Sequence, residues 1–224
     1  MYNVSGVVVT YNEEKVIRKA LEALQSFTDE IVLFDSFSTD STVKIAEEFN
    51  CRIYQHEFDN HRNQKNRAIE KCEKDWVFLI DADEYLEKNL IDNIQSLINN
   101  TDGIDAFNIP RKNYIDNDGP HGFPDFQTRL FRKYVRHYGH PFHHRADGNS
   151  KRSAAVMDKG CIMHEKTLQR QEQQNRLYYS LRPQDYDNVP PNGAEDVSID
   201  TEAIKDPENV NVYRDYLRRK DNVD

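Results

Sequence analysis

Short apolar runs alternate with amphipathic stretches through the first hundred residues. Val4–Thr10 is a β-branched apolar run of the kind found in strands buried on both faces. The next apolar side chains, over residues 16–24, recur at helical spacing. Asn12 is expected to cap this helix, because Glu13 and Glu14 would then lie in its first turn, beside the positive end of the helix dipole.

The same alternation continues to about residue 100. It predicts strands at residues 30–34, 52–55 and 76–80 and helices at residues 41–49, 63–74 and 88–98. Because strands and helices follow one another in a repeated order, we expect an α/β protein with a mainly parallel sheet and helices on both faces. Ligands of such sheets bind beyond the carboxyl ends of the strands.

The pattern changes after residue 100, where strand signals follow one another without long helices between them. They lie at residues 105–109, 127–132, 134–138 and 156–164, and Leu168–Leu181 is predicted to be a helix. From Pro183 onward the chain is rich in Pro, Asn and Asp and contains no Phe or Trp. We expect this stretch to be a mobile tail or a strap on the surface.

The composition fits one large folded domain, or one domain with an appendage. The chain has 224 residues, of which 12 are Tyr and 11 are Phe. No apolar run approaches the about 20 residues of a membrane-crossing helix, and the first residues do not resemble a secretory signal. Three scattered cysteines suit a reduced setting. We therefore expect a cytoplasmic protein, at most peripheral to the inner membrane face.

Charge is distributed unevenly along the chain. The net charge of −9 disfavours general binding to nucleic acid. Residues 111–152, in contrast, carry nine basic and four acidic side chains, a sum of +5, and five of the eight histidines. This segment can meet an anionic substrate, or it can be surface charge that balances the rest of the protein.

Three loops at the carboxyl edge of the predicted sheet carry the candidate chemistry. Tyr11 follows the first strand, Asp35 the second, and Asp81 and Asp83 the fourth, so these side chains should converge on one crevice. A ring can stack on a base, a carboxylate can accept a base N–H, and paired carboxylates can bind Mg²⁺ or Mn²⁺. Each feature alone also has a structural explanation, as a buried ring, a helix cap or a chance D-x-D. Their conjunction favours a nucleoside diphosphate site, and the absence of Gly-rich dinucleotide and P-loop motifs agrees.

Four motifs, in order, resemble family 2 glycosyltransferases of the GT-A fold. They are VVVTYNEEKVIRKALEAL, DEIVLFDSFSTDSTVKIAEEF, NQKNRAIEKCEKDWVFLIDADEYL and PDFQTRLFRK, within residues 4–181. The resemblance is greatest to small bacterial enzymes that add sugars to lipopolysaccharide cores. It implies a Rossmann-like, mixed but mainly parallel sheet in one domain over residues 1–182. Residues 1–100 would be its nucleotide-binding half and 101–182 a β-rich, acceptor-binding half, followed by a polar tail at 183–224.

The resemblance also implies roles for individual residues. It implies nucleoside or ribose contacts from Thr10, Tyr11, Glu13, Asp35 and Asp81, and a nucleotide contact from Lys65, with Gln64 or Asn66 as further candidates. It implies metal binding by Asp83 and by His164 of the CIMHEK segment. The implied cofactor is Mn²⁺ or Mg²⁺, and the implied donor is a UDP-sugar. Arg129 and Arg132 alternate with apolar residues. They can contact donor phosphates or an anionic acceptor, or they can form a solvated strand face.

The base that activates the acceptor hydroxyl is the point at which this sequence departs from its relatives. The resemblance implies single displacement with inversion, which needs such a base on the face opposite the leaving diphosphate. Relatives commonly carry Val-His-Glu after the RLFRR strand, whereas the PFHHR segment here places His144 at the position of the glutamate. Asp125 is the second candidate, and a third residue remains open.

The expected acceptor is a glycan or a lipid-linked saccharide. One alternative acceptor is a hydroxymethylated DNA base, which the basic segment permits and the acidic total disfavours. Two alternative functions are a haloacid-dehalogenase-type phosphatase, suggested by FLIDADEY, and an inactive domain that binds a nucleotide sugar. The sequence leaves the oligomeric state open.

Overall fold

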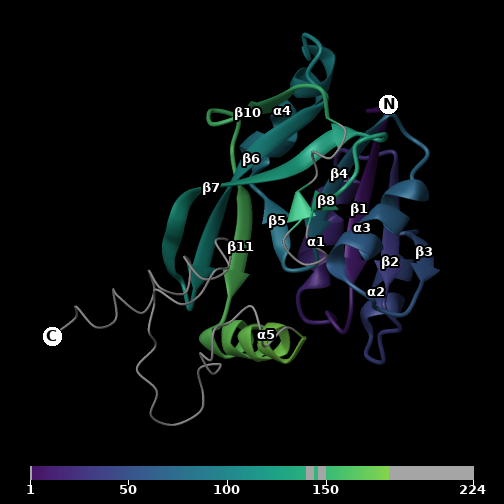
Figure 1. The fold of residues 1–224 in the computed structure, drawn as a ribbon, viewed down its shortest axis with the longest axis vertical. Coiled ribbons are helices and arrows are strands. Elements are labelled where there is room, and N and C mark those ends of the chain that lie inside the picture. Colours follow the sequence, from purple (N-terminus) through teal and green to yellow (C-terminus); the bar gives the residue numbers. More distant parts are fainter. Residues whose placement is uncertain (1, 140–143, 146–149, 182–224) are drawn as a thin grey trace, which may run out of the picture. The chain divides into compact units, whose positions relative to one another are not determined.

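The computed structural model describes residues 2–139, 144–145 and 150–181 (Figure 1). Its first part alternates strands and helices, in the order β1 (Val4–Thr10), α1 (Ile17–Gln25), β2 (Glu30–Asp35), α2 (Thr42–Glu48), β3 (Arg52–Gln55), α3 (His61–Glu70) and β4 (Trp76–Asp81). These strands pair in parallel in the order β3-β2-β1-β4. The mainly parallel first half expected from the sequence is confirmed.

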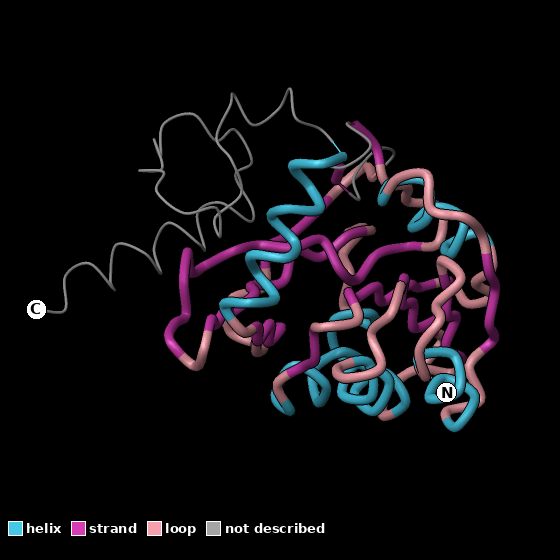
Figure 2. The backbone as a smooth tube through the Cα atoms, turned by 90° about the horizontal axis from the view of Figure 1, so that it is seen from below, coloured by secondary structure: helices cyan, strands magenta, loops and turns pink. Residues whose placement is uncertain are grey.

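The sheet of this first part is covered on both faces, as the alternation along β1 shows. Val8 packs in one apolar cluster with α1 residues such as Leu21, whereas its neighbour Val7 packs in a second cluster with Ala68 and Ile69 of α3. Figure 2 shows helices (cyan) on both sides of the strands (magenta). Because both faces are covered, β1 is buried at nearly every position, and its consecutive apolar residues Val7–Val9 made it recognisable in the sequence.

The second part is rich in strands. Its elements are β5 (Glu84–Leu86), α4 (Lys88–Asn99), β6 (Ala106–Ile115), β7 (Asp118–Arg132), β8 (Tyr138–Gly139), β9 (His144–Arg145), β10 (Ser153–Ala155), β11 (Ile162–Lys166) and α5 (Leu168–Leu181). The main sheet continues from β4 in the order β7-β6-β11-β5, and β7 runs antiparallel to β4. The sheet is therefore mixed. No helix in the described part of the chain is long and apolar enough to span a membrane.

Three local predictions are wrong. Asn12 does not cap a helix, since α1 begins only at Ile17, and the Asn12 side chain instead accepts a hydrogen bond from the backbone N–H of Thr39 at 2.8 Å. Of the strand predicted at residues 134–138, residues 134–137 form a turn and irregular backbone, and only Tyr138 lies in a strand, β8. The strand predicted at residues 156–164 begins only at Ile162, because a turn around Gly160, whose φ is 106°, precedes it.

The chain forms two compact units. Unit 1 comprises residues 1–111 and 126–163, and unit 2 comprises residues 112–125 and 164–224, of which the described part ends at 181. In unit 2, β6 and β7 meet at Asp116 and Asn117, which both have positive φ, as a two-residue type I′ turn requires. The predicted boundary at residue 100 stays a prediction. So does the tail at 183–224, which lies outside the described residues.

Candidate functional site

Strand register brings the candidate carboxylates of unit 1 to one edge of the sheet. Thr10 of β1 lies beside Asp35 of β2, and Val9 lies beside Asp81 of β4. Asp35 is fully buried, whereas the side chain of Asp81 is 33% exposed. The carboxyl ends of three adjacent parallel strands therefore carry the Thr10 hydroxyl and both carboxylates at one edge of the sheet, the edge where ligands of α/β sheets bind.

The Asp35 carboxylate is held by its own loop. It accepts hydrogen bonds from the Ser38 hydroxyl at 2.5 Å, from the Ser38 backbone N–H at 2.9 Å and from the Gln55 side-chain amide at 2.9 Å. Ser38 in turn accepts a hydrogen bond from the backbone N–H of Asn12 at 2.8 Å. These contacts tie the loop after β1 to the loop after β2, so the position of Asp35 is fixed before any ligand binds.

Two aromatic rings lie on the same pair of loops and are exposed. Tyr11 is 56% exposed and Phe37 is 50% exposed. Glu13 also belongs to this region, where its backbone N–H donates to the Thr42 hydroxyl at 2.7 Å. The loops therefore combine a rigid polar frame with exposed ring surface.

Asp81 belongs to a network of five charged side chains within unit 1. Its carboxylate pairs with Lys65 of α3 at 3.1 Å and with Arg129 of β7 at 2.7 Å. Arg129 also pairs with Glu84 at 2.7 Å, and Glu84 pairs with Arg111 of β6 at 2.9 Å. Two carboxylates and three cations are thus connected in one network that reaches from Asp81 to Arg111.

The protonation state of Asp81 follows from these neighbours. Burial raises the pKa of its carboxyl, but Arg129 and then Lys65 lower it more, so the pKa lies well below its usual value. For Arg129 the same effects have opposite signs. Burial lowers the pKa of its guanidinium, but Asp81 and Glu84 raise it more, so the pKa lies above its usual value. Asp81 is therefore a permanent anion whose charge is already balanced by cations of the protein.

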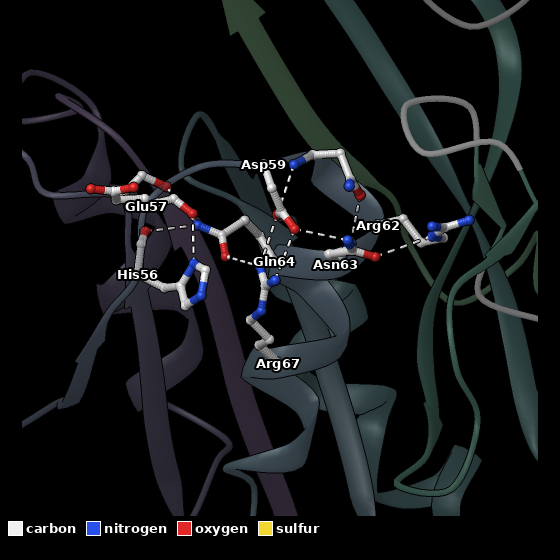
Figure 3. A network of polar contacts seen from close by, with 9 residues as sticks. His56, Glu57, Asp59, Arg62, Asn63, Gln64 and Arg67 are labelled. Atoms are coloured by element: carbon white, nitrogen blue, oxygen red, sulfur yellow. Dashed lines mark hydrogen bonds and ion pairs between the residues drawn. The ribbon is translucent and has the colours of Figure 1, made fainter.

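A second polar network fixes α3, the helix that carries Lys65 (Figure 3). The buried Gln64 side chain donates to the Ser36 hydroxyl at 2.9 Å and to the His56 carbonyl at 3.1 Å. Arg67 donates to Gln64 and, with both terminal nitrogens, to the Asp59 carboxylate at 2.8 Å. The hydrogen bond from Arg67 is the largest cause of the lowered pKa of Asp59. Gln64 thereby connects α3 to the loop that holds Asp35.

Not every predicted residue joins this group. Arg132 pairs in register with Trp76 at the other end of β4, and its guanidinium lies 4.3 Å from the Trp76 ring centroid. Asp83 lies in the turn after β4 and is partly exposed. His144 lies in β9, and its side chain falls outside what the structure describes.

Two further predicted residues lie in unit 2, where they share one neighbour. Asn113 of β6 donates its side-chain amide to Asp125 at 2.8 Å, and its side-chain oxygen lies 2.7 Å from Nδ1 of the buried His164. Over the described ranges, no three His, Cys, Asp or Glu side chains gather as a ready-made metal site.

Sequence reasoning missed several members of these networks. Ser38 and Gln55, which orient Asp35, resemble ordinary loop and strand-end residues. Glu84 and Arg111 were also missed, although Glu84 directly follows the D-x-D segment and the alternation of Glu84–Leu86 could have indicated the short strand β5. Only the pairing of distant strands shows that Arg111 and Glu84 meet.

The fold and the site define a GT-A domain, and comparison with known proteins gives the family. Residues 5–161 match the profile of glycosyl transferase family 2, so the chain belongs to this family. An uncharacterised glycosyltransferase of Rickettsia conorii is 36% identical over 58% of this chain and 48% of its own length. The lipopolysaccharide core biosynthesis glycosyltransferase LpsC of Rhizobium meliloti is 32% identical over 50% of this chain and 43% of its own. The chain spans about half the length of the curated relatives it matches.

Solved structures agree on the fold. S. aureus TarS 1–349 in complex with UDP-GlcNAc superposes with a TM-score of 0.59 and 22% identity, over 73% of this chain and 58% of that one. At this identity the likeness establishes the fold alone. The GT-A fold and the family resemblance expected from the sequence are both confirmed.

Proposed function

We propose that this protein is a metal-dependent, inverting glycosyltransferase that moves a sugar from a UDP-sugar to a hydroxyl group of a glycan or lipid-linked saccharide. The observation that carries the proposal is the register that places Thr10 beside Asp35 and Val9 beside Asp81 at one sheet edge. Membership of family 2 supports the sugar transfer. The solved complex of TarS with UDP-GlcNAc supports UDP as the nucleotide.

The nucleoside would bind to the loops after β1 and β2. Asp35 would accept an N–H of the base, and the exposed Tyr11 ring would stack on it. Thr10 supports this assignment, because its hydroxyl is buried and finds no hydrogen-bond partner in the described part of the chain. Such a group is costly unless it is satisfied, and a polar nucleoside would satisfy it.

The diphosphate would bind near the charge network around Asp81. Lys65 and Arg129, which both contact Asp81, bring positive charge to this edge of the sheet, and positive charge favours an anion there. Asp81 itself is already paired with cations, which suits the ribose contact assigned to it better than metal ligation.

The protein side chains available as metal ligands fit a divalent cation that is held mainly by the diphosphate of the UDP-sugar. Mg²⁺ commonly binds one or two protein carboxylates and completes its shell with phosphate oxygens and water. Asp83, a partly exposed carboxylate, would be a protein ligand, and His164 keeps the ligand role that the family resemblance implies for it. When bound, the cation stabilises the negative charge that develops on the leaving diphosphate.

The acceptor hydroxyl would lose its proton to a side chain as it attacks the anomeric carbon. Asp125 and His144 both remain candidates for this base. The phosphatase alternative is not supported, because the family match covers residues 5–161. An inactive sugar-nucleotide-binding domain would bind UDP-sugars without turnover, and the alanine variants of Asp125 and His144 would then change nothing.

The decisive test is binding of UDP and UDP-sugars to the full chain, measured by thermal shift and calorimetry with and without Mn²⁺. UDP should raise the melting temperature, with a larger rise in Mn²⁺. Asp35→Asn should weaken UDP binding about tenfold or more, since a charged hydrogen bond is lost, and Asp83→Asn should abolish the effect of Mn²⁺. Ser38→Ala is the matched control, because it removes a contact of Asp35 but keeps the carboxylate. Binding by Asp35→Asn as tight as by wild type would contradict the nucleoside site.

A further inference from the structure

Asn113 links two side chains that the proposed mechanism uses. It is 1% exposed in β6, and within unit 2 it lies between Asp125 and His164. Its Nδ2 is 2.8 Å from Oδ2 of Asp125, and its Oδ1 is 2.7 Å from Nδ1 of His164. His164 is itself 6% exposed, so its orientation depends on this contact more than that of a solvated ring would.

The chemistry of Asp125 fixes which way the Asn113 amide faces. An ionised carboxylate accepts hydrogen bonds and donates none, so the NH₂ group of Asn113 must face Asp125. The amide oxygen then faces His164, and an amide oxygen only accepts. Nδ1 of the neutral His164 ring must therefore carry the hydrogen, and Nε2 carries the lone pair.

We propose that Asn113 is a positioning residue that locks His164 in the Nδ1–H tautomer, and that Asp125 sets this tautomer through Asn113. Nε2 is then the ring nitrogen able to bind a divalent cation, which is how a partner on the opposite nitrogen orients metal-binding histidines in general. The role in cation binding rests on the proposed function. The tautomer rests on the contacts within unit 2 alone.

Asp125→Asn is the sharpest test because it leaves both His164 and Asn113 in the sequence unchanged. The new amide can donate as well as accept, so the Asn113 amide can turn over and present its NH₂ group to Nδ1. The Nε2–H tautomer should then become populated. Asn113→Ala should have the same effect by removing the constraint altogether. Asn108→Ala is the matched control, because Asn108 lies on the same strand and accepts a hydrogen bond from Thr128.

The readout is two-bond ¹H–¹⁵N NMR on ¹⁵N-histidine-labelled full chain without metal, at about pH 8, above the usual imidazole pKa of about 6.5. His164→Gln identifies the His164 signals. Wild type and Asn108→Ala should show His164 with Nδ1 protonated and Nε2 unprotonated. A wild-type ring with Nε2 protonated would overturn the proposal, as would unchanged spectra in both Asp125→Asn and Asn113→Ala.

Cation affinity gives a second readout that does not depend on turnover. Mn²⁺ binding in the presence of UDP, followed by electron paramagnetic resonance, should weaken at least about tenfold in Asn113→Ala and stay unchanged in Asn108→Ala. If the wild type binds no Mn²⁺ with UDP, the proposed metal dependence fails and the tautomer result stands on its own. If the wild type binds Mn²⁺ and Asn113→Ala binds it equally well, the positioning role is wrong.

Discussion

Phe37 is an unusual residue for its backbone position. Its φ is 61°, in the left-handed region that bulky side chains rarely adopt, and half of its surface is exposed. It lies between Ser36 and Ser38, whose hydrogen bonds to Gln64 and Asp35 hold the loop in this conformation. The surrounding contacts therefore impose a conformation that the residue itself disfavours.

Replacing Phe37 by glycine should stabilise the protein. Glycine adopts positive φ without steric cost, so we expect Phe37→Gly to raise the free energy of unfolding by about 0.5–1 kcal/mol, after the entropy that glycine adds to the unfolded chain. Urea denaturation measures this change. Phe37→Ala keeps the unfavourable φ and should show no gain. Equal gains for both variants would mean that ring exposure, not backbone strain, is the cost.

At the residue scale, sequence could find the candidates and not their partners. Asp35 and Asp81 were predictable, because each directly follows a buried strand. The ion pair between Asp81 and Arg129 joins positions 48 residues apart, and no local pattern encodes it. For the same reason, the structural role of Arg129 could not be distinguished from contact with phosphate.

Among the elements, those with local signals were predictable. The strand at Arg52–Gln55 and the helix at Leu168–Leu181 have the predicted bounds: Ile53 and Tyr54 are strand-forming residues, and residues 168–181 contain helix-forming Gln, Glu and Arg and no Gly or Pro. The irregular backbone at residues 134–137 was not predictable, because Val135 is buried by tertiary packing rather than by strand pairing. A segment that is buried in irregular backbone can have the same pattern of apolar residues as a strand.

Asp105, just before β6, ties residues 150–152 to that strand. Its carboxylate accepts hydrogen bonds from the Ser150 hydroxyl at 2.5 Å and from the backbone N–H groups of Lys151 at 2.8 Å and Arg152 at 3.2 Å. Burial raises the pKa of Asp105, but these contacts and the Tyr134 hydroxyl lower it by more, so the pKa falls to about 2. This carboxylate is thus held in its charged form.

The Asp105 carboxylate should contribute to the free energy of unfolding at neutral pH, and this contribution should be lost at very acidic pH. Because the folded state lowers its pKa, the stabilisation is full above the unfolded value of about 4 and is lost as the pH falls towards 2. Asp105→Asn should lower the melting temperature at pH 7, and the difference from wild type should shrink below about pH 4. Asp102→Asn, two residues after the helix α4 cap, is the control. A difference that persists at pH 2 would contradict this linkage.

At the scale of the whole molecule, the charge network of Lys65, Asp81, Glu84, Arg111 and Arg129 joins four strands of unit 1, namely β4, β5, β6 and β7, to α3. Arg129 contacts both carboxylates and has 4% of its side chain exposed. Removing one member of such a network leaves charges that the remaining members compensate only in part. The network therefore links the integrity of the sheet to that of the candidate site.

Arg129→Met should be strongly destabilising, by about 3–5 kcal/mol, because Asp81 and Glu84 each lose a cation. Chemical denaturation followed by circular dichroism measures the loss. Arg132→Met is the matched control on the same strand, since it removes the contact with the Trp76 ring and no partner of Asp81 or Glu84, for an expected loss of about 1 kcal/mol or less. Similar losses in both variants would show that the network contributes little.

The antiparallel position of β7 has a consequence for the order in which the protein is made. When a ribosome has produced only the first hundred residues, the edge of β4 that β7 will cover has no neighbouring strand, and Asp81 and Glu84 still lack the guanidinium groups that balance them. An open strand edge of this kind invites association with other chains. The nascent polypeptide thus has a vulnerable interval, which closes only when residues near 129 emerge and complete the sheet.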